Sequence, residues 1–409
     1  MLVSITQHAP TPPPAESYDY FVSTTGNDGN PGTIGSPFAT IDHAINVAAA
    51  ALTGTGKVIG VRGGTYSQMN DSSTGSGTSN TNRILVKNYN GEYVLMKPPA
   101  ASPFIIRLGK TTSQSYIVFD GINEDGTDID YFMNKLEVVA GVGEAHHITF
   151  QNADWLMGRA YVGILNSGDF VGPQGSNIVR NITIHGPNVQ NLTDSNLAAL
   201  PNEAFYIGTS NNLIEGCNIS GILGGGGQLT NSYGQIQDSN IIRNNYWHDI
   251  VDVQANDPFA RIWAFIVFAV GTDNRFYNNV MARIGTGGSL HYGLAVGGGA
   301  VDTKVWFNTA YHVLGTSYDC DQDTTTSGSA RELRDNISYD STVDSAHTSG
   351  YTVSNNLFSV DPSFVNAGAS DFHLQGGSAA KGAGITVSAV PTDKDGVTRA
   401  NPPSIGAYE

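Results

Sequence analysis

Four side chains that could perform acid–base chemistry occur at matching places in the second half of the chain. Asp249, Arg283, His312 and Asp340 each follow an asparagine of a repeated pattern by four residues. If the repeats stack, these side chains form one exterior strip that could bind a sugar or transfer protons. Asp252 adds a second carboxylate near Asp249, as glycoside hydrolysis requires. The candidate catalytic residues are Asp249, Arg283, His312 and Asp252, and the alternative is a row of surface ion pairs.

Aromatic and polar residues around this strip are the candidates for sugar binding. Trp247 and Trp263 lie near it in the sequence, and both could instead pack beneath loops. His291 and Tyr292 stand in the glycine-rich stretch GTGGSLHYGLAVGGG, where glycines let a ligand approach the backbone or mark bends at coil corners. The candidate substrate-binding residues are Trp247, His248, Asp257, Arg261, Trp263, His291, Tyr292 and Asp340.

A third group of acidic residues resembles the start of a calcium loop. Asp319, Asp321 and Asp323 alternate along the chain, as the first ligands of such a loop do. However, Thr324 stands where the loop needs glycine, and Ala330 stands where it needs glutamate. A bound calcium ion and an acidic surface loop are therefore both open, and no other cofactor is required.

The strip depends on a repeat whose positions can be aligned. Seven segments align without gaps, and they begin at Asn177, Asn212, Asn240, Asn274, Thr303, Arg331 and Tyr351. Their third residues are all apolar, as expected of one inward-facing position on stacked strands. Second strands of the same coils are predicted in the stretches EAFYIGTS, SYGQIQDS, WAFIVFAVGTD and HYGLAVGGG.

The sixth position of the repeat is the most informative. After Ile182 and Cys217 it holds an asparagine in every segment, namely Asn245, Asn279, Asn308, Asn336 and Asn356. Amides buried at the same corner of successive coils can hydrogen bond the backbone and one another, whereas an isolated buried amide without a partner would cost about 1–3 kcal/mol. The pattern predicts a structural asparagine ladder.

These patterns together predict an all-β fold, a single-stranded right-handed parallel β-helix solenoid with an N-terminal capping α-helix. The helix is predicted from apolar residues at helical spacing within SPFATIDHAINVAAAAL, with Ser36 or Thr40 as its N-cap. It should cover the strand edges that an open end would expose. The predicted organisation is a Pro-rich arm at 1–19, an opening segment with the helix at 20–66, the coils at 67–360 and a closing segment at 361–409.

Composition narrows the classes of partner. The 409 residues carry a formal net charge of −16, which argues against nucleic acid because phosphate binding needs clustered Lys and Arg. No apolar run is long enough to span a membrane. The start MLVSITQHAPTPPPAES has neither the basic nor the apolar region of a secretory signal. Cys217 and Cys320 are too few for a disulfide scaffold.

The two ends of the chain resemble a known family. The stretch YFVSTTGNDGNPGTIGSPFATIDHAI, followed by VIGVRGGTY, resembles the opening of right-handed β-helix proteins of the pectate-lyase-like superfamily. The stretches DPSFVNAGASDFHLQGGSAAKGAG and DKDGVTRANPPSIGAYE resemble their closing segment, so the resemblance covers Tyr20 to Glu409. Members include polysaccharide lyases, glycoside hydrolases, epimerases and phage tailspikes, so the resemblance implies the fold and leaves the function open. For a lyase it implies a calcium ion and an Arg or Lys base, and the nearest matching cluster runs from Trp247 to Trp263.

Two functions agree with these observations. The arm holds Pro10, Pro12, Pro13 and Pro14 after a short apolar start, and we expect it to anchor the solenoid to other protein subunits. The leading hypothesis is a virion-surface protein, like a phage tailspike or head decoration, that binds a surface polysaccharide and in one version also cleaves it. The alternative is a secreted, extracellular bacterial polysaccharide lyase or glycoside hydrolase.

Overall fold

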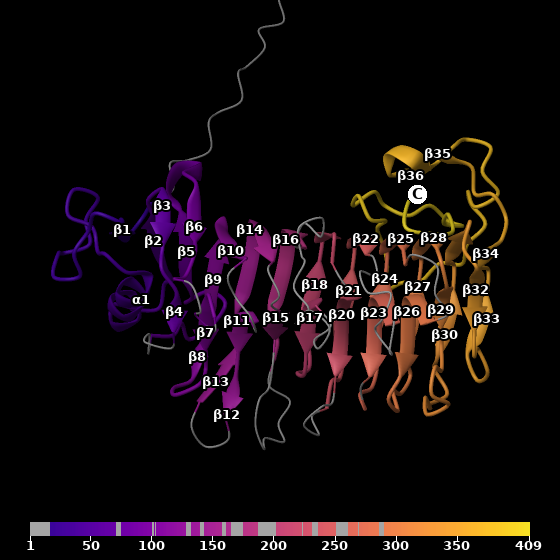
Figure 1. The fold of residues 1–409 in the computed structure, drawn as a ribbon, viewed down its shortest axis with the longest axis horizontal. Helices are drawn as coiled ribbons and strands as arrows, with labels where there is room; N and C mark the ends of the chain where they lie inside the picture. The colour runs from indigo at the N-terminus through magenta and orange to yellow at the C-terminus, as the bar shows by residue number, and fades with distance from the viewer. Residues whose placement is uncertain are drawn as a thin grey trace, which may run out of the picture.

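The chain winds into an elongated stack of coils, with strands side by side along one axis (Figure 1). The computed structural model describes residues 17–70, 75–99, 102, 104–127, 132–139, 143–157, 161–164, 175–186, 202–222, 224–230, 236–250, 261–268, 270–285 and 290–409. Strands of successive coils pair in parallel and form a 21-stranded and a 10-stranded sheet. One apolar cluster extends inside the coils from Val22 to Tyr351. This is the predicted right-handed parallel β-helix.

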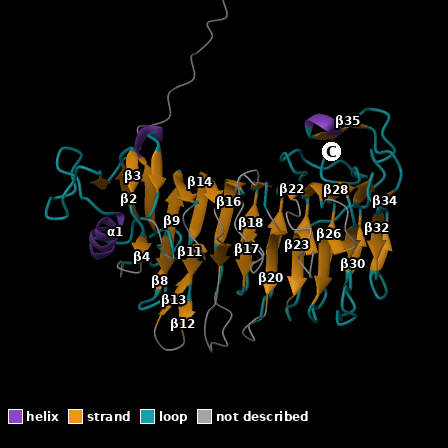
Figure 2. Cartoon of the chain, in the orientation of Figure 1, coloured by secondary structure: helices purple, strands orange, loops and turns teal. Residues whose placement is uncertain are grey.

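Strands are the main regular element of the described chain (Figure 2). The larger sheet contains β1 (Tyr20–Val22), β2 (Lys57–Val61), β3 (Gly64–Tyr66), β5 (Ile84–Asn88), β6 (Val94–Met96), β9 (Ile117–Asp120), β10 (Ile122–Gly126), β14 (Thr149–Met157), β16 (Ile178–His185), β18 (Leu213–Glu215), β19 (Asn218–Ser220), β21 (Ile241–Arg243), β22 (Tyr246–Ile250), β24 (Arg275–Tyr277), β25 (Val280–Ile284), β27 (Lys304–Trp306), β28 (Thr309–Val313), β30 (Glu332–Arg334), β31 (Ile337–Tyr339), β33 (Thr352–Ser354) and β34 (Leu357–Phe358). The second sheet contains β4 (Met69–Asn70), β7 (Ile106–Leu108), β11 (Phe132–Leu136), β15 (Tyr161–Ile164), β17 (Asn202–Ile207), β20 (Gly224–Thr230), β23 (Arg261–Phe268), β26 (Leu290–Gly297), β29 (Thr316–Asp319) and β32 (Val343–Ala346). The shorter sheets contain β8 (Gln114–Ser115), β12 (Val138–Val139) and β13 (Gly143–His146), and then β35 (Phe364–Asn366) with β36 (Asp371–Leu374).

The predicted asparagine ladder runs along one corner of the coils. Asn279 Oδ1 accepts hydrogen bonds from the backbone N–H and from Nδ2 of Asn245, at 3.1 and 3.0 Å. Asn308 accepts the same two bonds from Asn279, both at 3.0 Å. Asn336 accepts the same two bonds from Asn308, at 2.9 and 3.0 Å. Asn356 accepts them from Asn336, also at 2.9 and 3.0 Å. Each amide is satisfied by the next coil, which fixes the register of the stack.

The inward column of the repeat is present in six of its seven coils. Its buried members are Val179, Ile214, Ile242, Phe276, Val305 and Leu333. Val353 is 45% exposed instead, which corrects the prediction for the last segment. It lies on the final coil, where no further coil packs against the inner side chains.

A second asparagine ladder was not predicted. Asn177, Asn212, Asn240 and Asn274 open four of the repeat segments, and all are buried. Asn212 Oδ1 accepts a hydrogen bond from Asn177 N at 3.1 Å, and Asn240 Oδ1 accepts one from Asn212 N at 2.9 Å. Asn274 Oδ1 continues the series with Asn240 N at 3.0 Å. Thr303 takes the next place, so the column does not hold asparagine in every segment. For this reason the first residue of each segment serves only to align the repeats and does not indicate a ladder.

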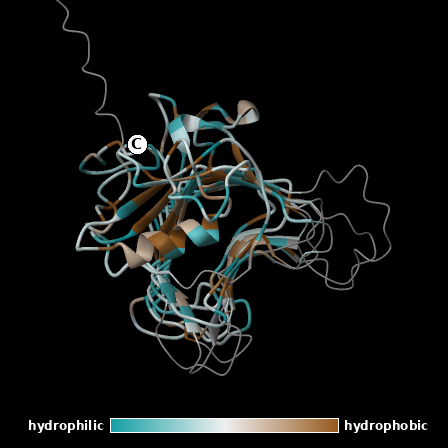
Figure 3. Ribbon diagram, turned by 90° about the vertical axis from the view of Figure 1, so that its left-hand side faces the viewer, coloured by the Kyte–Doolittle hydropathy of each residue, from teal (hydrophilic) through white to brown (hydrophobic). Residues whose placement is uncertain are grey.

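Helix α1 (Ile41–Ala50) lies at the N-terminal end of the stack, and Figure 3 shows it in front of the coils. Of the two predicted N-caps, Ser36 and Thr40, the structure has Thr40. Its side chain accepts a hydrogen bond from His43 N at 3.2 Å. The helix buries Ile41, Ala44, Ile45 and Ala48 in the main core. In the part of the chain that the structure describes, no helix combines the length and the apolarity needed to cross a membrane.

The closing segment folds back over the outside of the larger sheet. Figure 1 shows β35 and β36 above β22, β25 and β28. Phe364 and Phe372 of this segment pack with Ile337 in one apolar cluster. Val387 packs with Trp306 in another. The segment therefore covers the outer face of these coils and shapes the space above them.

The strand that pairs with β17 and β23 is β20, whose sequence is GGGGQLT. The stretch SYGQIQDS was expected to supply this strand. Residues 232–235 of that stretch lie outside the described residues, and residues 236–239 contain no strand. Because glycine is depleted in strands, the glycine-rich sequence of β20 does not predict a strand. A Cβ on Gly225 would lie 2.4 Å from Trp263 Nε1, and one on Gly227 would lie 2.8 Å from the Phe265 ring. The glycines are there because aromatic rings of the next coil occupy the space of a side chain.

Replacing Gly225 with alanine should lower the free energy of unfolding by about 1–3 kcal/mol, because the new methyl group overlaps the Trp263 indole. Gly376→Ala is the matched control, since a Cβ at that position meets nothing within 4 Å. Urea denaturation of both variants measures the difference. Equal stability of the two variants would contradict the packing described here.

Candidate active site

The stacking of β22, β25, β28 and β31 brings the predicted strip together. Asp249, Arg283, His312 and Asp340 lie at the same corner of these coils, and each has a left-handed backbone with φ between 52° and 56°. Arg283 contacts Asp249, and His312 contacts Asp340. The prediction that these side chains are neighbours is therefore confirmed, and their contacts divide the strip into two pairs.

Asp249 and Arg283 form an ion pair with two hydrogen bonds. Arg283 Nε lies 2.6 Å from Asp249 Oδ1, and Arg283 Nη2 lies 2.9 Å from Oδ2. The same guanidinium donates to Tyr246 Oη at 3.1 Å and to Ser370 Oγ at 3.3 Å. The hydrogen bonds between Arg283 and Asp249 raise the pKa of Arg283 and lower the pKa of Asp249. Since both groups are held in their charged forms, the geometry favours the ion-pair interpretation here, with Arg283 joining the closing segment to the coils.

His312 and Asp340 form the other pair of the strip. His312 Nδ1 lies 2.9 Å from Asp340 Oδ2, and the two side chains are 42% and 55% exposed. When Asp340 accepts the proton of Nδ1, the second ring nitrogen, Nε2, is the one that can exchange a proton with a substrate. An imidazole oriented by a carboxylate suits acid–base chemistry better than the paired guanidinium does.

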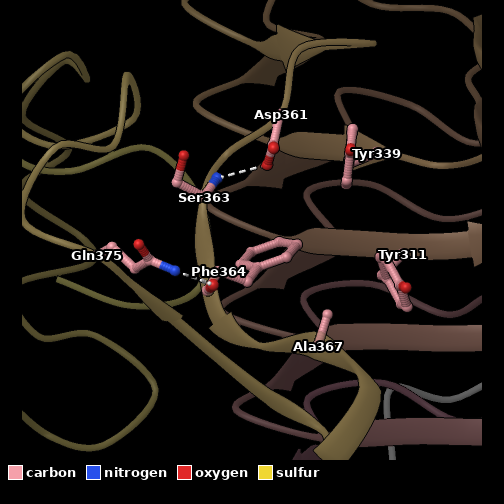
Figure 4. A pocket seen from close by; sticks show the side chains of 7 residues that line it. All are labelled: Tyr311, Tyr339, Asp361, Ser363, Phe364, Ala367 and Gln375. Carbon is pink, nitrogen blue, oxygen red and sulfur yellow. Dashed lines mark hydrogen bonds between the residues drawn. The ribbon is translucent and has the colours of Figure 1, made fainter.

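A cavity of about 310 Å³ lies between the closing segment and strands β28 and β31. Figure 4 shows Tyr311 and Tyr339 on the strand side and the residues of the closing segment opposite them. Its lining residues are Tyr311, Tyr339, Asp361, Ser363, Phe364, Ala367 and Gln375. Tyr311 and Tyr339 directly precede His312 and Asp340, and the rings of Tyr311 and His312 are 6.1 Å apart. The His312–Asp340 pair therefore lies directly next to two lining residues in the chain, although neither member is itself among the lining residues.

Polar side chains at the edge of the cavity are held by backbone contacts. Asp361 Oδ1 accepts a hydrogen bond from Ser363 N at 2.7 Å, and Gln375 Nε2 donates to the Phe364 carbonyl at 2.8 Å. Both bonds are drawn in Figure 4. A carboxylate and an amide in fixed positions, together with aromatic faces, are the composition that oriented ligand binding needs.

Four of the predicted sugar-binding residues, Arg261, Trp263, His291 and Tyr292, lie on the second sheet. Trp263 on β23 and Tyr292 on β26 are register partners in a small cluster apart from the main core, and they are 5% and 6% exposed. They are neighbours, but on a different sheet from the strip. His291 is 1% exposed and packs over Gly285, in agreement with a coil corner and not with a ligand contact.

Trp247 and His248 are occupied by contacts within the fold. Trp247 faces inward from β22, is 1% exposed, and lies in the main core, so its predicted contact with sugar is corrected. His248 Nδ1 lies 2.5 Å from Asp249 Oδ2 and its Nε2 lies 2.9 Å from Asn218 Oδ1. Burial lowers the pKa of His248. Arg261 begins β23, and Asp252 and Asp257 lie outside the described residues.

The three aspartates of the predicted calcium loop are used by separate turns. Asp319 Oδ1 lies 2.9 Å from His347 Nδ1, and Asp321 Oδ1 accepts a hydrogen bond from Thr326 N at 2.9 Å. Asp323 Oδ2 accepts one from Gly298 N at 2.8 Å. Among the described residues, no group of three or more His, Cys, Asp or Glu side chains is arranged to hold a metal ion. Each of the three carboxylates is therefore used by contacts of its own, and Asp319, which ends β29, is only 3% exposed. A calcium ion at these residues stays a prediction.

Several buried carboxyl groups were not singled out from the sequence, and two of them are glutamates on strands whose pKa is raised. Glu203 on β17 and Glu124 on β10 are each 2% exposed. Burial raises the pKa of both, and it raises the pKa of Glu124 to about 8. Asn134 Nδ2 donates to both oxygens of Glu124, at 3.1 and 2.9 Å. Both glutamates occur in stretches that read as strands, but no sequence signal separates a buried glutamate from an exposed one.

The stability of the protein should therefore fall between about pH 4.5 and pH 8. The unfolded chain releases the proton of Glu124 near its ordinary pKa, whereas the folded chain keeps it to about pH 8. Glu124→Gln should reduce this slope and stabilise the protein at pH 8 by a few kcal/mol, on the order of the shift. Urea unfolding at pH 5 and pH 8 measures it, with half-exposed Glu144→Gln as the control. A slope identical to that of the natural chain would contradict the assignment.

Comparison with solved structures supports the architecture. Pectate lyase Pel9A is 18% identical to this chain, with a TM-score of 0.63 over 97% of both chains. A rhamnogalacturonan lyase is 16% identical, with a TM-score of 0.53 over 85% of this chain and 90% of its own. No protein-family model matches the sequence, and no curated protein matches it. The chain therefore has the right-handed parallel β-helix fold of the pectate-lyase-like proteins.

Proposed function

We propose that this chain binds polysaccharide and cleaves it where the His312–Asp340 pair adjoins the lining of the cavity. One observation carries the proposal: aromatic walls that can hold a sugar ring lie next to an imidazole that can transfer a proton. The fold adds support, because the structurally similar proteins include a pectate lyase and a rhamnogalacturonan lyase.

Each part of the site has its own task in this proposal. Tyr311 and Tyr339, whose ring centroids are 6.4 Å apart, offer aromatic faces to the apolar faces of sugar rings. Asp361 and Gln375 can hydrogen bond sugar hydroxyl groups. His312 transfers the proton, while its carboxylate partner orients the ring.

The setting of the activity is a separate proposal. Anchoring on a virion through residues 1–19, with other protein subunits as partners, agrees with the Pro-rich composition of the arm. Residues 1–16 lie outside the described residues. A secreted enzyme would use the same site without that anchor. Deleting residues 1–16 should abolish incorporation into particles in the first setting and leave cleavage intact in both.

A polysaccharide screen tests the proposed function. The full chain is incubated with neutral and uronate polysaccharides, and reducing ends and unsaturated-product absorbance are followed. We expect new ends from at least one polysaccharide, and loss of that activity in Tyr339→Ala, which removes one wall of the cavity. Neither binding nor product across the panel would contradict the proposal.

A further inference from the structure

The charged side chains at the cavity are of one sign. Asp361 lies in its wall and Asp340 lies beside it, and both are exposed. None of the seven described residues that line the cavity is Lys or Arg. Arg283, the cation of the coil before His312, already binds both oxygens of Asp249. A ligand in this cavity therefore meets carboxylates without a cation among the lining residues to offset them.

A sugar that carries its own carboxylate is disfavoured in such surroundings. Proteins that recognise carboxylates place Arg or Lys against them, because two unpaired like charges repel at short range. Uncharged hydroxyl groups suit the cavity well, since a carboxylate such as that of Asp361 is a strong acceptor for them. The volume of about 310 Å³ is near the lower end of the range for ligand pockets. It suits a short stretch of sugar and not a long chain.

We infer that the cavity takes uncharged sugar residues and discriminates against uronates. The inference rests on the proposed function and names its substrate class. It also selects the reaction, because β-elimination requires a proton that is acidified by a neighbouring carboxylate, which a neutral sugar lacks. Cleavage is then hydrolysis: the glycosidic C–O bond breaks, the hydroxyl of water joins the anomeric carbon, and the remaining proton of water ends on the oxygen of the leaving sugar. His312 Nε2 is the group that relays this proton.

Matched oligosaccharides test the discrimination. The α-1,4-linked galactotetraose differs from tetragalacturonate only at C6 of each sugar, and xylotetraose lacks C6 altogether. Calorimetric titration of the full chain should show at least one neutral oligosaccharide binding at least about tenfold more tightly than tetragalacturonate. Cleavage of a neutral polysaccharide should yield reducing ends without unsaturated product.

Two charge variants test the cause. Asp361→Asn keeps an acceptor for Ser363 N but removes the charge, so it should narrow the ratio of the two affinities at least about threefold. Asp154→Asn, on an exposed position of β14 outside the cavity, should leave the ratio unchanged. An unchanged ratio in Asp361→Asn would contradict the role of its charge. Tighter binding of tetragalacturonate by the natural chain would overturn the substrate class alone, whereas no binding of any glycan would overturn the proposed function itself.

Discussion

Replacing His312 with alanine should lower kcat/KM on the substrate found by screening by about 100- to 10,000-fold, the usual contribution of a positioned acid–base group. The affinity for the substrate should change little, because the walls of the cavity come from other residues. Asp340→Asn should have a smaller effect, since the imidazole remains but loses the carboxylate that orients it. Initial rates give the first quantity, and calorimetric titration gives the second.

A second His–Asp pair in the same protein supplies the control. His347 Nδ1 lies 2.9 Å from Asp319 Oδ1, the same separation as in the pair at the cavity. His347 directly follows β32 on the second sheet, whereas His312 lies on β28 next to the lining residue Tyr311, so His347→Ala should retain full activity. Equal losses in the two histidine variants, or full activity in His312→Ala, would show that proton transfer takes place elsewhere.

Replacing Asn308 with alanine should lower the free energy of unfolding by about 3–5 kcal/mol. Asn308 is 1% exposed, and its Oδ1 accepts two hydrogen bonds from Asn279. Its Nδ2 donates to the Phe276 carbonyl at 2.9 Å and to Asn336 Oδ1 at 3.0 Å. Alanine leaves these buried groups without partners, and each such group costs about 1–3 kcal/mol.

The matched control for the ladder is an exposed asparagine on a strand. Asn218 Oδ1 on β19 accepts a hydrogen bond from His248 Nε2 at 2.9 Å. Asn218→Ala should therefore cost less than about 1 kcal/mol. Urea unfolding followed by circular dichroism compares the two variants with the natural chain. Similar midpoints for Asn308→Ala and Asn218→Ala would contradict the stabilising role of the ladder.

The fold could be predicted because its stabilising contacts repeat in the sequence. Asn279 and Asn308 stack because the same residue type recurs at one corner, and the recurrence is visible without a structure. The same alignment predicted that Arg283 would lie beside Asp249. Prediction failed where the repeat was masked by composition, as in β20, whose glycines are set by the rings of the next coil.

The cavity could not be predicted, because no local pattern joins its two sides. Tyr311 belongs to a coil, whereas Gln375 belongs to the closing segment, and tertiary packing decides which coils that segment covers. The chemistry of the strip was also undetermined. Which of its pairs remains available depends on partners such as Ser370, which joins Arg283 from a distant part of the chain.

A crystal structure with the best-binding neutral oligosaccharide tests the central claim most directly. The account predicts a sugar ring against Tyr311 or Tyr339, with a glycosidic or water oxygen within hydrogen-bonding distance of His312 Nε2. A sugar bound instead over Trp263 and Tyr292 on the second sheet, with the cavity free of sugar, would contradict it.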